Sequence, residues 1–116
     1  MDTVIQTDIK KMLGIEESTT EFDIDIRSGI NSAFFTLWQL GVGIDELISI
    51  DETTTWAEIS TSVPLDVIRE YLYLKVKAVF DPAGSSFVAN ALQERISELE
   101  FRMNIHVDNG GGVVSG

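Results

Sequence analysis

Apolar residues recur with the period of an α-helix in four separate segments of the chain. In residues 3–13, Ile5 is followed by apolar residues four, seven and eight positions later. Residues 22–43, 64–80 and 85–104 repeat this spacing, which matches about 3.6 residues per helical turn. The pattern predicts an all-α fold, a small four-helix domain.

Residues 22–43 carry the strongest amphipathic pattern, and their ends carry helix-terminating signals. Thr20 or Asp23 can cap the start, and Gly41 and Gly43 can end the helix. Gly29 inside the helix favours close packing against a neighbour. The predicted buried stripe consists of Ile26, Ile30, Ala33, Phe34, Leu37 and Trp38.

The helix predicted over residues 64–80 is apolar over much of its circumference, so it packs on more than one side. It is either the central core helix of the domain or part of a contact with a neighbouring subunit, and the pattern leaves both open. One face carries Ile68, Leu72, Val76 and Val79, and the next carries Val67, Tyr71, Leu74 and Ala78. The candidate subunit-interface residues are Tyr71, Tyr73, Lys75 and Lys77.

An irregular segment, residues 44–62, separates the second and third predicted helices. "LISID" and the β-branched "TTTWAEI" leave open a short pair of strands there. Trp56 is interpreted as a buried anchor that enters the core from this loop, in preference to a ligand-stacking residue. The predicted core anchors are Phe34, Trp38, Trp56, Leu72 and Leu99.

The stretch "VFDPAGSSF" predicts the corner of an antiparallel helix hairpin. Pro82 disfavours helical geometry at Asp81, Gly84 permits a sharp reversal, and Ser85 can cap the next helix. That helix is expected to end near Asn104. Residues 1–104 are therefore expected to form the helical domain, and residues 105–116 a flexible, Gly-rich tail.

The net charge of −11 is unevenly distributed along the chain. Residues 1–66 carry 13 acids and three bases, whereas residues 67–116 carry six acids and five bases. This excess argues against a sequence-reading DNA-binding protein, which needs a basic surface to neutralise phosphates. It is compatible with a surface that DNA passes without binding, or simply with ordinary solubility charge.

The residue types for catalysis or for binding a metal or cofactor are sparse. The chain has no cysteine and a single histidine, His106, and its loop acids do not match a calcium-binding loop. No catalytic serine motif and no phosphate-binding glycine loop is present. We therefore expect no enzymatic activity, no cofactor and no metal. No long apolar stretch or secretory signal is visible, so we expect no membrane association.

Three stretches together resemble the small head–tail connector proteins, also called adaptor or head-completion proteins, of long-tailed bacteriophages. They are "INSAFFTLWQLGVG" at 30–43, the loop around Trp56, and "YLYLKVKAVFDPAGSSFVANALQERISELEFRMN" at 71–104. The first belongs to the aromatic-bearing second helix, and the last contains the "Tyr–x–x–Leu–Lys–Val–(Lys/Arg)–x–x–Phe-Asp-Pro" helix end and the final "Glu-Leu-Glu-x-Arg" element. The resemblance covers most of residues 5–105.

This resemblance implies a structural virion protein without catalysis. It implies a homo-oligomeric ring, most often of twelve copies, beneath the portal protein in the viral neck. The ring would extend the channel for double-stranded DNA and present a docking surface to the next neck or tail protein, after assembly in the bacterial host cytoplasm. The contact candidates are the acidic loop, residues 44–58, and the tail residues Ile105, His106, Val107, Val113 and Val114.

Two other functions remain open at this point. One is a different phage neck or tail-assembly protein, such as a tail terminator or an assembly chaperone. The other is a small DNA-binding regulator, which the acidic composition disfavours.

Overall fold

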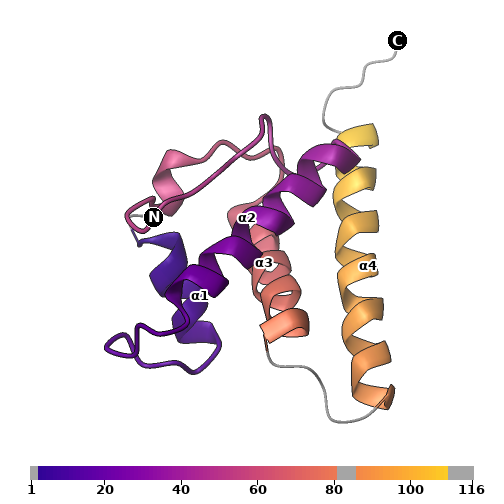
Figure 1. Ribbon diagram of the computed structural model, residues 1–116. Helices are drawn as coiled ribbons and strands as arrows, with labels where there is room; N and C mark the ends of the chain where they lie inside the picture. Colours follow the sequence, from indigo (N-terminus) through magenta and orange to yellow (C-terminus); the bar gives the residue numbers. More distant parts are fainter. Residues whose placement is uncertain (1–2, 81–85, 110–116) are drawn as a thin grey trace.

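The computed structural model describes residues 3–80 and 86–109, with side chains up to residue 105. Its helices are α1 (Ile5–Met12), α2 (Asp23–Leu40), α3 (Leu65–Phe80) and α4 (Ser86–Asn109). A short 3₁₀-helix, η1 (Trp56–Glu58), lies in the long connection between α2 and α3 (Figure 1). No strand forms within the described residues, so the predicted all-α class is confirmed.

Glycines end the first two helices, and the end predicted at Gly41 is confirmed. Gly14 and Gly41 have φ angles of 81° and 75°, in the left-handed region that glycine adopts without steric cost. The predicted caps of α2 are wrong, because Phe22 occupies the N-cap position and no side chain caps the helix. Asp23 is the first helical residue instead, and its carboxylate lies 2.9 Å from Lys10 Nζ in an ion pair.

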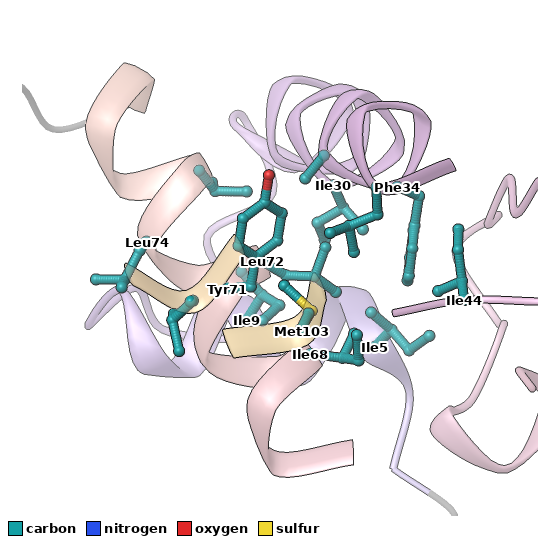
Figure 2. Packing of buried hydrophobic residues seen from close by; sticks show 14 of the residues in the cluster. Ile5, Ile9, Ile30, Phe34, Ile44, Ile68, Tyr71, Leu72, Leu74 and Met103 are labelled. Atoms are coloured by element: carbon teal, nitrogen blue, oxygen red, sulfur yellow. The ribbon is translucent and has the colours of Figure 1, made fainter. Parts of the chain in front are cut away.

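Helix α3 is the central element of the fold, since it packs against α1, α2 and α4. In Figure 1, α2 crosses α3, and α4 lies beside α3. Side chains from all these helices converge in one core, among them Ile9, Ile30, Phe34, Leu72 and Met103 (Figure 2). The apolar circumference of α3 is therefore used largely within a single copy of the chain.

Close backbone approach explains why two glycines lie in this core. A Cβ on Gly29 would lie 3.3 Å from Val76 Cγ2, so α2 and α3 meet tightly there, as predicted. A Cβ on Gly43 would lie 2.9 Å from Met103 Sδ and 3.0 Å from Ile68 Cδ1. Gly43 thus lets the chain leave α2 directly over the ends of α3 and α4.

The connection between α2 and α3 is irregular but tied to the helices. The strand pair left open by the sequence is reduced to two isolated antiparallel bridges, Val4 with Thr55 and Ile44 with Thr61. The backbone N–H of Ile5 donates to Thr54 O at 2.9 Å, and that of Trp56 donates to Thr3 O at 3.1 Å. These bonds attach the connection to the start of α1.

Helix α4 continues to Asn109, five residues beyond its predicted end. The division into a domain of residues 1–104 and a tail of residues 105–116 stays a prediction. The predicted corner residues, Asp81, Pro82, Gly84 and Ser85, lie outside the described residues. The flanking helices do run as the hairpin requires, with Phe80 ending α3 and Ser86 beginning α4.

Candidate interaction surfaces

A buried carboxylate joins the first helix, the long connection and the central helix. Asp8 Oδ2 accepts hydrogen bonds from Trp56 Nε1 at 3.0 Å and from Arg69 Nε at 2.6 Å, and Asp8 Oδ1 accepts from Arg69 Nη2 at 3.0 Å. The bond from Arg69 holds the pKa of Asp8 below its usual value; burial opposes this effect, and Trp56 adds to it. The fork of Arg69 is the bidentate geometry that strengthens such pairs.

Further hydrogen bonds fix the shape of the acidic loop, residues 44–58. Asn31 on α2 exchanges two bonds with the backbone of Ile50, accepting from its N–H at 2.7 Å and donating to its carbonyl at 3.3 Å. Glu58 Oε2 accepts from the backbone N–H of Thr55 at 2.9 Å. Asp51 accepts from Thr53 and Thr54, and the backbone bond from Thr53 lowers the pKa of Asp51 most. These hydrogen bonds therefore give the loop a fixed shape.

This loop presents a hollow whose lining is more polar than apolar, here called the acidic hollow. It is lined by Glu46, Leu47, Ile48, Ser49, Thr54, Glu58, Ile59 and Ser60. Leu47 is 49% exposed, and Ile48 and Ile59 are partly buried. Residues 44–58 contain five acids and no lysine or arginine. The hollow can thus receive an apolar side chain beside a cation.

An ion pair and a tyrosine hydrogen bond fasten the middle of α4 to α3. Arg95 donates to Glu70 on α3 at 2.8 and 2.9 Å and to Glu98 at 2.7 Å, and Arg102 donates to Glu98 at 2.9 Å. The bond from Arg95 lowers the pKa of Glu98. Tyr71 Oη donates to Glu100 at 2.7 Å. These contacts therefore fix how far α4 is shifted along α3.

The start of α4 is uncovered in the single chain. The inner stripe of α4 is buried at Ile96, Leu99 and Met103, but residues 86–91 are all exposed, with Phe87 at 81%. Val79, in the last turn of α3, is also 81% exposed. Large apolar side chains in water at two adjoining helix ends indicate a contact surface.

A second apolar region lies along α2 and the far half of α4. Phe35 and Trp38 expose about half of their surface, with ring centroids 6.0 Å apart. Leu40 and Phe101 border a groove between the end of α2 and α4, which Val42, Ser97, Glu100 and Asn104 also line. This groove is separate from the uncovered start of α4.

The structure confirms four of the predicted core anchors and overturns the fifth. Phe34, Trp56, Leu72 and Leu99 are buried. The prediction that Trp38 anchors the core is wrong, because its side chain is 48% exposed. Trp38 lies on the flank of the buried stripe of α2, where no other element covers it.

Of the four candidate subunit-interface residues, one is buried and three are half-buried. Tyr71 is fully buried beneath α4, so its side chain is not available to a neighbouring subunit and this assignment is corrected. Tyr73, Lys75 and Lys77 are half-buried. The ammonium of Lys75 lies 6.0 Å from the centroid of the Tyr71 ring, and that of Lys77 lies 6.0 Å from Tyr73.

Of the candidate contact residues in the tail, Ile105 lies on α4 and is 38% exposed. His106 and Val107 belong to the same helix, but their side chains lie outside the described residues. Val113 and Val114 are outside them entirely. The tail contacts stay predictions.

The cluster of Asp8, Trp56 and Arg69 is the main feature that sequence reasoning missed. A signal was present, because Asp8 lies three residues after Ile5 and four before Met12, on the apolar side of its helix. An acid in such a stripe needs a buried partner. The partners, however, are 48 and 61 residues away in the chain.

The described part of the chain lacks two further classes of site. Nowhere in it do three or more His, Asp or Glu side chains gather to hold a metal ion. None of its helices combines the length and apolar character that crossing a membrane requires.

Comparison with known proteins gives one match, which is to a protein family. The model of a family described as phage connector protein matches residues 5–110. No curated protein and no solved structure matches the chain. The matched range includes all four helices and the acidic loop.

Proposed function

Because the chain belongs to the phage connector protein family, we propose that it forms a ring beneath the portal and joins the phage head to the tail. The family consists of structural proteins of the phage neck, and the family match is the observation that carries the proposal. In this role the protein is a virion component that binds the portal on one side and the next neck or tail protein on the other. It assembles in the bacterial host cytoplasm and performs no catalysis.

The distribution of exposed apolar surface supports an assembled state. Eleven large apolar side chains of the described residues are exposed, among them Phe87, Phe101 and Trp38. They occupy at least two separate regions, the start of α4 and the flank of α2. A ring subunit inserted between two other components needs several contact surfaces, and separate apolar regions meet that need.

The electrostatics support a channel that double-stranded DNA passes without sequence-specific binding. The chain has 19 acids and only eight bases. Arg69, Arg95 and Arg102 are engaged with carboxylates of the same chain, as is Lys10. Few cations are then left to neutralise phosphates, and the surface repels them.

Binding to purified portal tests the proposal. The protein is mixed with portal rings, the complex is separated by size exclusion, and negative-stain images are compared with those of the portal alone. We expect an added ring layer on the face of the portal that points away from the head. Binding to tail tubes with no binding to portal would instead support a tail terminator or assembly chaperone. A gel shift with double-stranded DNA at roughly 50 mM salt, where non-specific binding is strong, would support a DNA-binding regulator.

A further inference from the structure

Two surfaces at opposite ends of the molecule are complementary in charge. The first, here called the hairpin end, comprises residues 75–80 of α3 and residues 86–91 of α4. The second is the acidic hollow, lined by Glu46, Leu47, Ile48, Glu58 and Ile59. In Figure 1 the hairpin end lies at the bottom of the view, and the acidic loop lies at the upper left. One chain therefore cannot bring its own two surfaces together.

The hairpin end exposes apolar side chains in a stretch of the chain that carries more lysines than acids. Val79 and Phe87 are each 81% exposed. Residues 71–93 contain Lys75, Lys77 and one acid, whereas the whole chain has a net charge of −11. The hairpin end thus combines apolar side chains with neighbouring cations.

The acidic hollow has the opposite character. Leu47, Ile48 and Ile59 contribute apolar atoms to a lining that also includes Glu46, Glu58 and three hydroxyl side chains, and the surrounding loop has five acids and no base. The bonds of Asn31 to Ile50 and of Glu58 to Thr55 hold its shape in the single chain. A preformed hollow loses little conformational entropy when it binds.

We propose that the hairpin end of one copy docks in the acidic hollow of the next copy, so that copies join head to tail. This inference rests on the proposed function and names the surfaces by which the ring would close. Two copies of so acidic a protein repel each other in most orientations. The docked orientation brings a stretch with more lysines than acids against a loop with five acids and no base, which reduces the repulsion.

The two surfaces differ from each other, so the contact is heterologous. A heterologous contact leaves one hairpin end and one hollow open after each addition, and it yields a ring when the rotation between copies closes. An isologous contact would stop at two copies.

Disulfide trapping tests the contact directly, because the natural chain has no cysteine. One variant carries Phe87→Cys, and a second, enlarged by a mass tag, carries Leu47→Cys. Both side chains are exposed, at 81% and 49%, so both variants should fold. The two are mixed and oxidised, and the products are separated by mass. We expect more mixed dimer than either homodimer. Docking brings the thiol at position 87 of one copy next to the thiol at position 47 of the other.

A matched control uses Phe101→Cys with the same tagged Leu47→Cys variant. Phe101 is also on α4 and is 63% exposed, but it borders the groove beside Leu40 and not the hairpin end. This pair should give only the proportions of random collision. An excess of mixed dimer with Phe101→Cys, or random proportions with Phe87→Cys, overturns the proposal.

Charge reversal provides a second test with its own rescue. Lys75→Glu alone and Glu46→Lys alone should each abolish the excess of the Phe87–Leu47 mixed dimer. Lys75→Glu in the Phe87→Cys variant, mixed with Glu46→Lys in the Leu47→Cys variant, should restore it. Lys11→Glu, on the exposed side of α1, is the control and should have no effect. Failure of the combined reversal to restore trapping would contradict the charge pairing.

The trapping result and the portal experiment separate this contact from the proposed function. Portal binding as a ring layer without Phe87–Leu47 trapping would overturn this contact and leave the function standing. Trapping without portal binding would overturn the function and leave the head-to-tail contact standing.

Discussion

Asp8 and Trp56 are 48 residues apart in the chain, yet the indole Nε1 of Trp56 donates a hydrogen bond of 3.0 Å to the buried carboxylate of Asp8. Arg69 donates to the same carboxylate through two nitrogens. The first helix, the acidic loop and the central helix are therefore joined at one residue. Because the loop forms a candidate contact surface, this cluster links the stability of the domain to the shape of that surface.

Replacement of Asp8 should destabilise the protein and loosen the loop. In Asp8→Ala, Trp56 Nε1 loses its acceptor inside the core and Arg69 loses its partner, at a cost of about 2–4 kcal/mol in the free energy of unfolding. Asp8→Asn keeps an acceptor and should cost less. Urea unfolding followed by circular dichroism measures both. Asp45→Ala, at an exposed loop acid, is the control. Equal stability of Asp8→Ala and wild type would contradict the role of the cluster.

Acid should remove the contribution of Asp8. Its pKa is lowered in the folded state, chiefly by the bond from Arg69, so the unfolded chain takes up a proton first as the pH falls. The stabilisation is complete above the usual pKa of 3.8 and is lost as the pH falls from there through the folded value. Unfolding free energies measured between neutral pH and pH of about 3 should fall more steeply for wild type than for Asp8→Asn. Parallel curves would show that Asp8 is not responsible.

Truncation of the two tryptophans should lower the free energy of unfolding by different amounts. Trp56 is fully buried, so Trp56→Ala should cost about 3–5 kcal/mol, whereas Trp38→Ala should cost less than about 1 kcal/mol. Thermal unfolding of the two variants measures the difference. Fluorescence quenching by a soluble quencher should be stronger in Trp56→Phe, which retains exposed Trp38, than in Trp38→Phe. The reverse order would restore Trp38 as a core anchor.

Gly43 and Gly41 form a matched pair of left-handed glycines. Both have positive φ angles, but only Gly43 has neighbours within contact distance of an added Cβ. Gly41→Ala should cost about 1–2 kcal/mol from backbone strain alone. Gly43→Ala should cost a further 1–3 kcal/mol or so, because Met103 and Ile68 must move. Chemical unfolding of both variants tests this order, and equal costs would exclude the tight approach.

Alkaline titration should report on the burial of Tyr71. Burial raises the pKa of Tyr71 far above its usual value of 10.0, and the bond to Glu100 adds to the effect. Since the unfolded chain ionises near 10.0, the contribution of Tyr71 is full below that pH and is lost as the pH rises beyond it. Tyr71→Phe should therefore lose about 1 kcal/mol at neutral pH and show a flatter alkaline stability curve. Near-UV absorbance titration of Tyr73→Phe should show no phenolate until the protein unfolds.

Local sequence signals determined the helices, their approximate limits and most of the core. The apolar period placed Phe34, Leu72 and Leu99 inside, and glycine at positions 14 and 41 ended two helices because few other residues adopt positive φ without strain. Trp56 was predicted to be a buried anchor because a large aromatic side chain in a loop gains most by packing in the core, and it is buried. The acidic character of residues 44–58 is likewise a property of composition alone.

Only the tertiary structure decided where each apolar stripe is covered. Helical spacing shows which side of a helix faces inward, but the extent of cover depends on the lengths and crossing of the other helices. Trp38 and Val79 continue their stripes beyond the edge of the core and are exposed for that reason. The partners of Asp8 come from elements far apart in the chain, so no local pattern could identify them. The tertiary structure likewise places the hairpin end and the acidic hollow at opposite ends of one molecule.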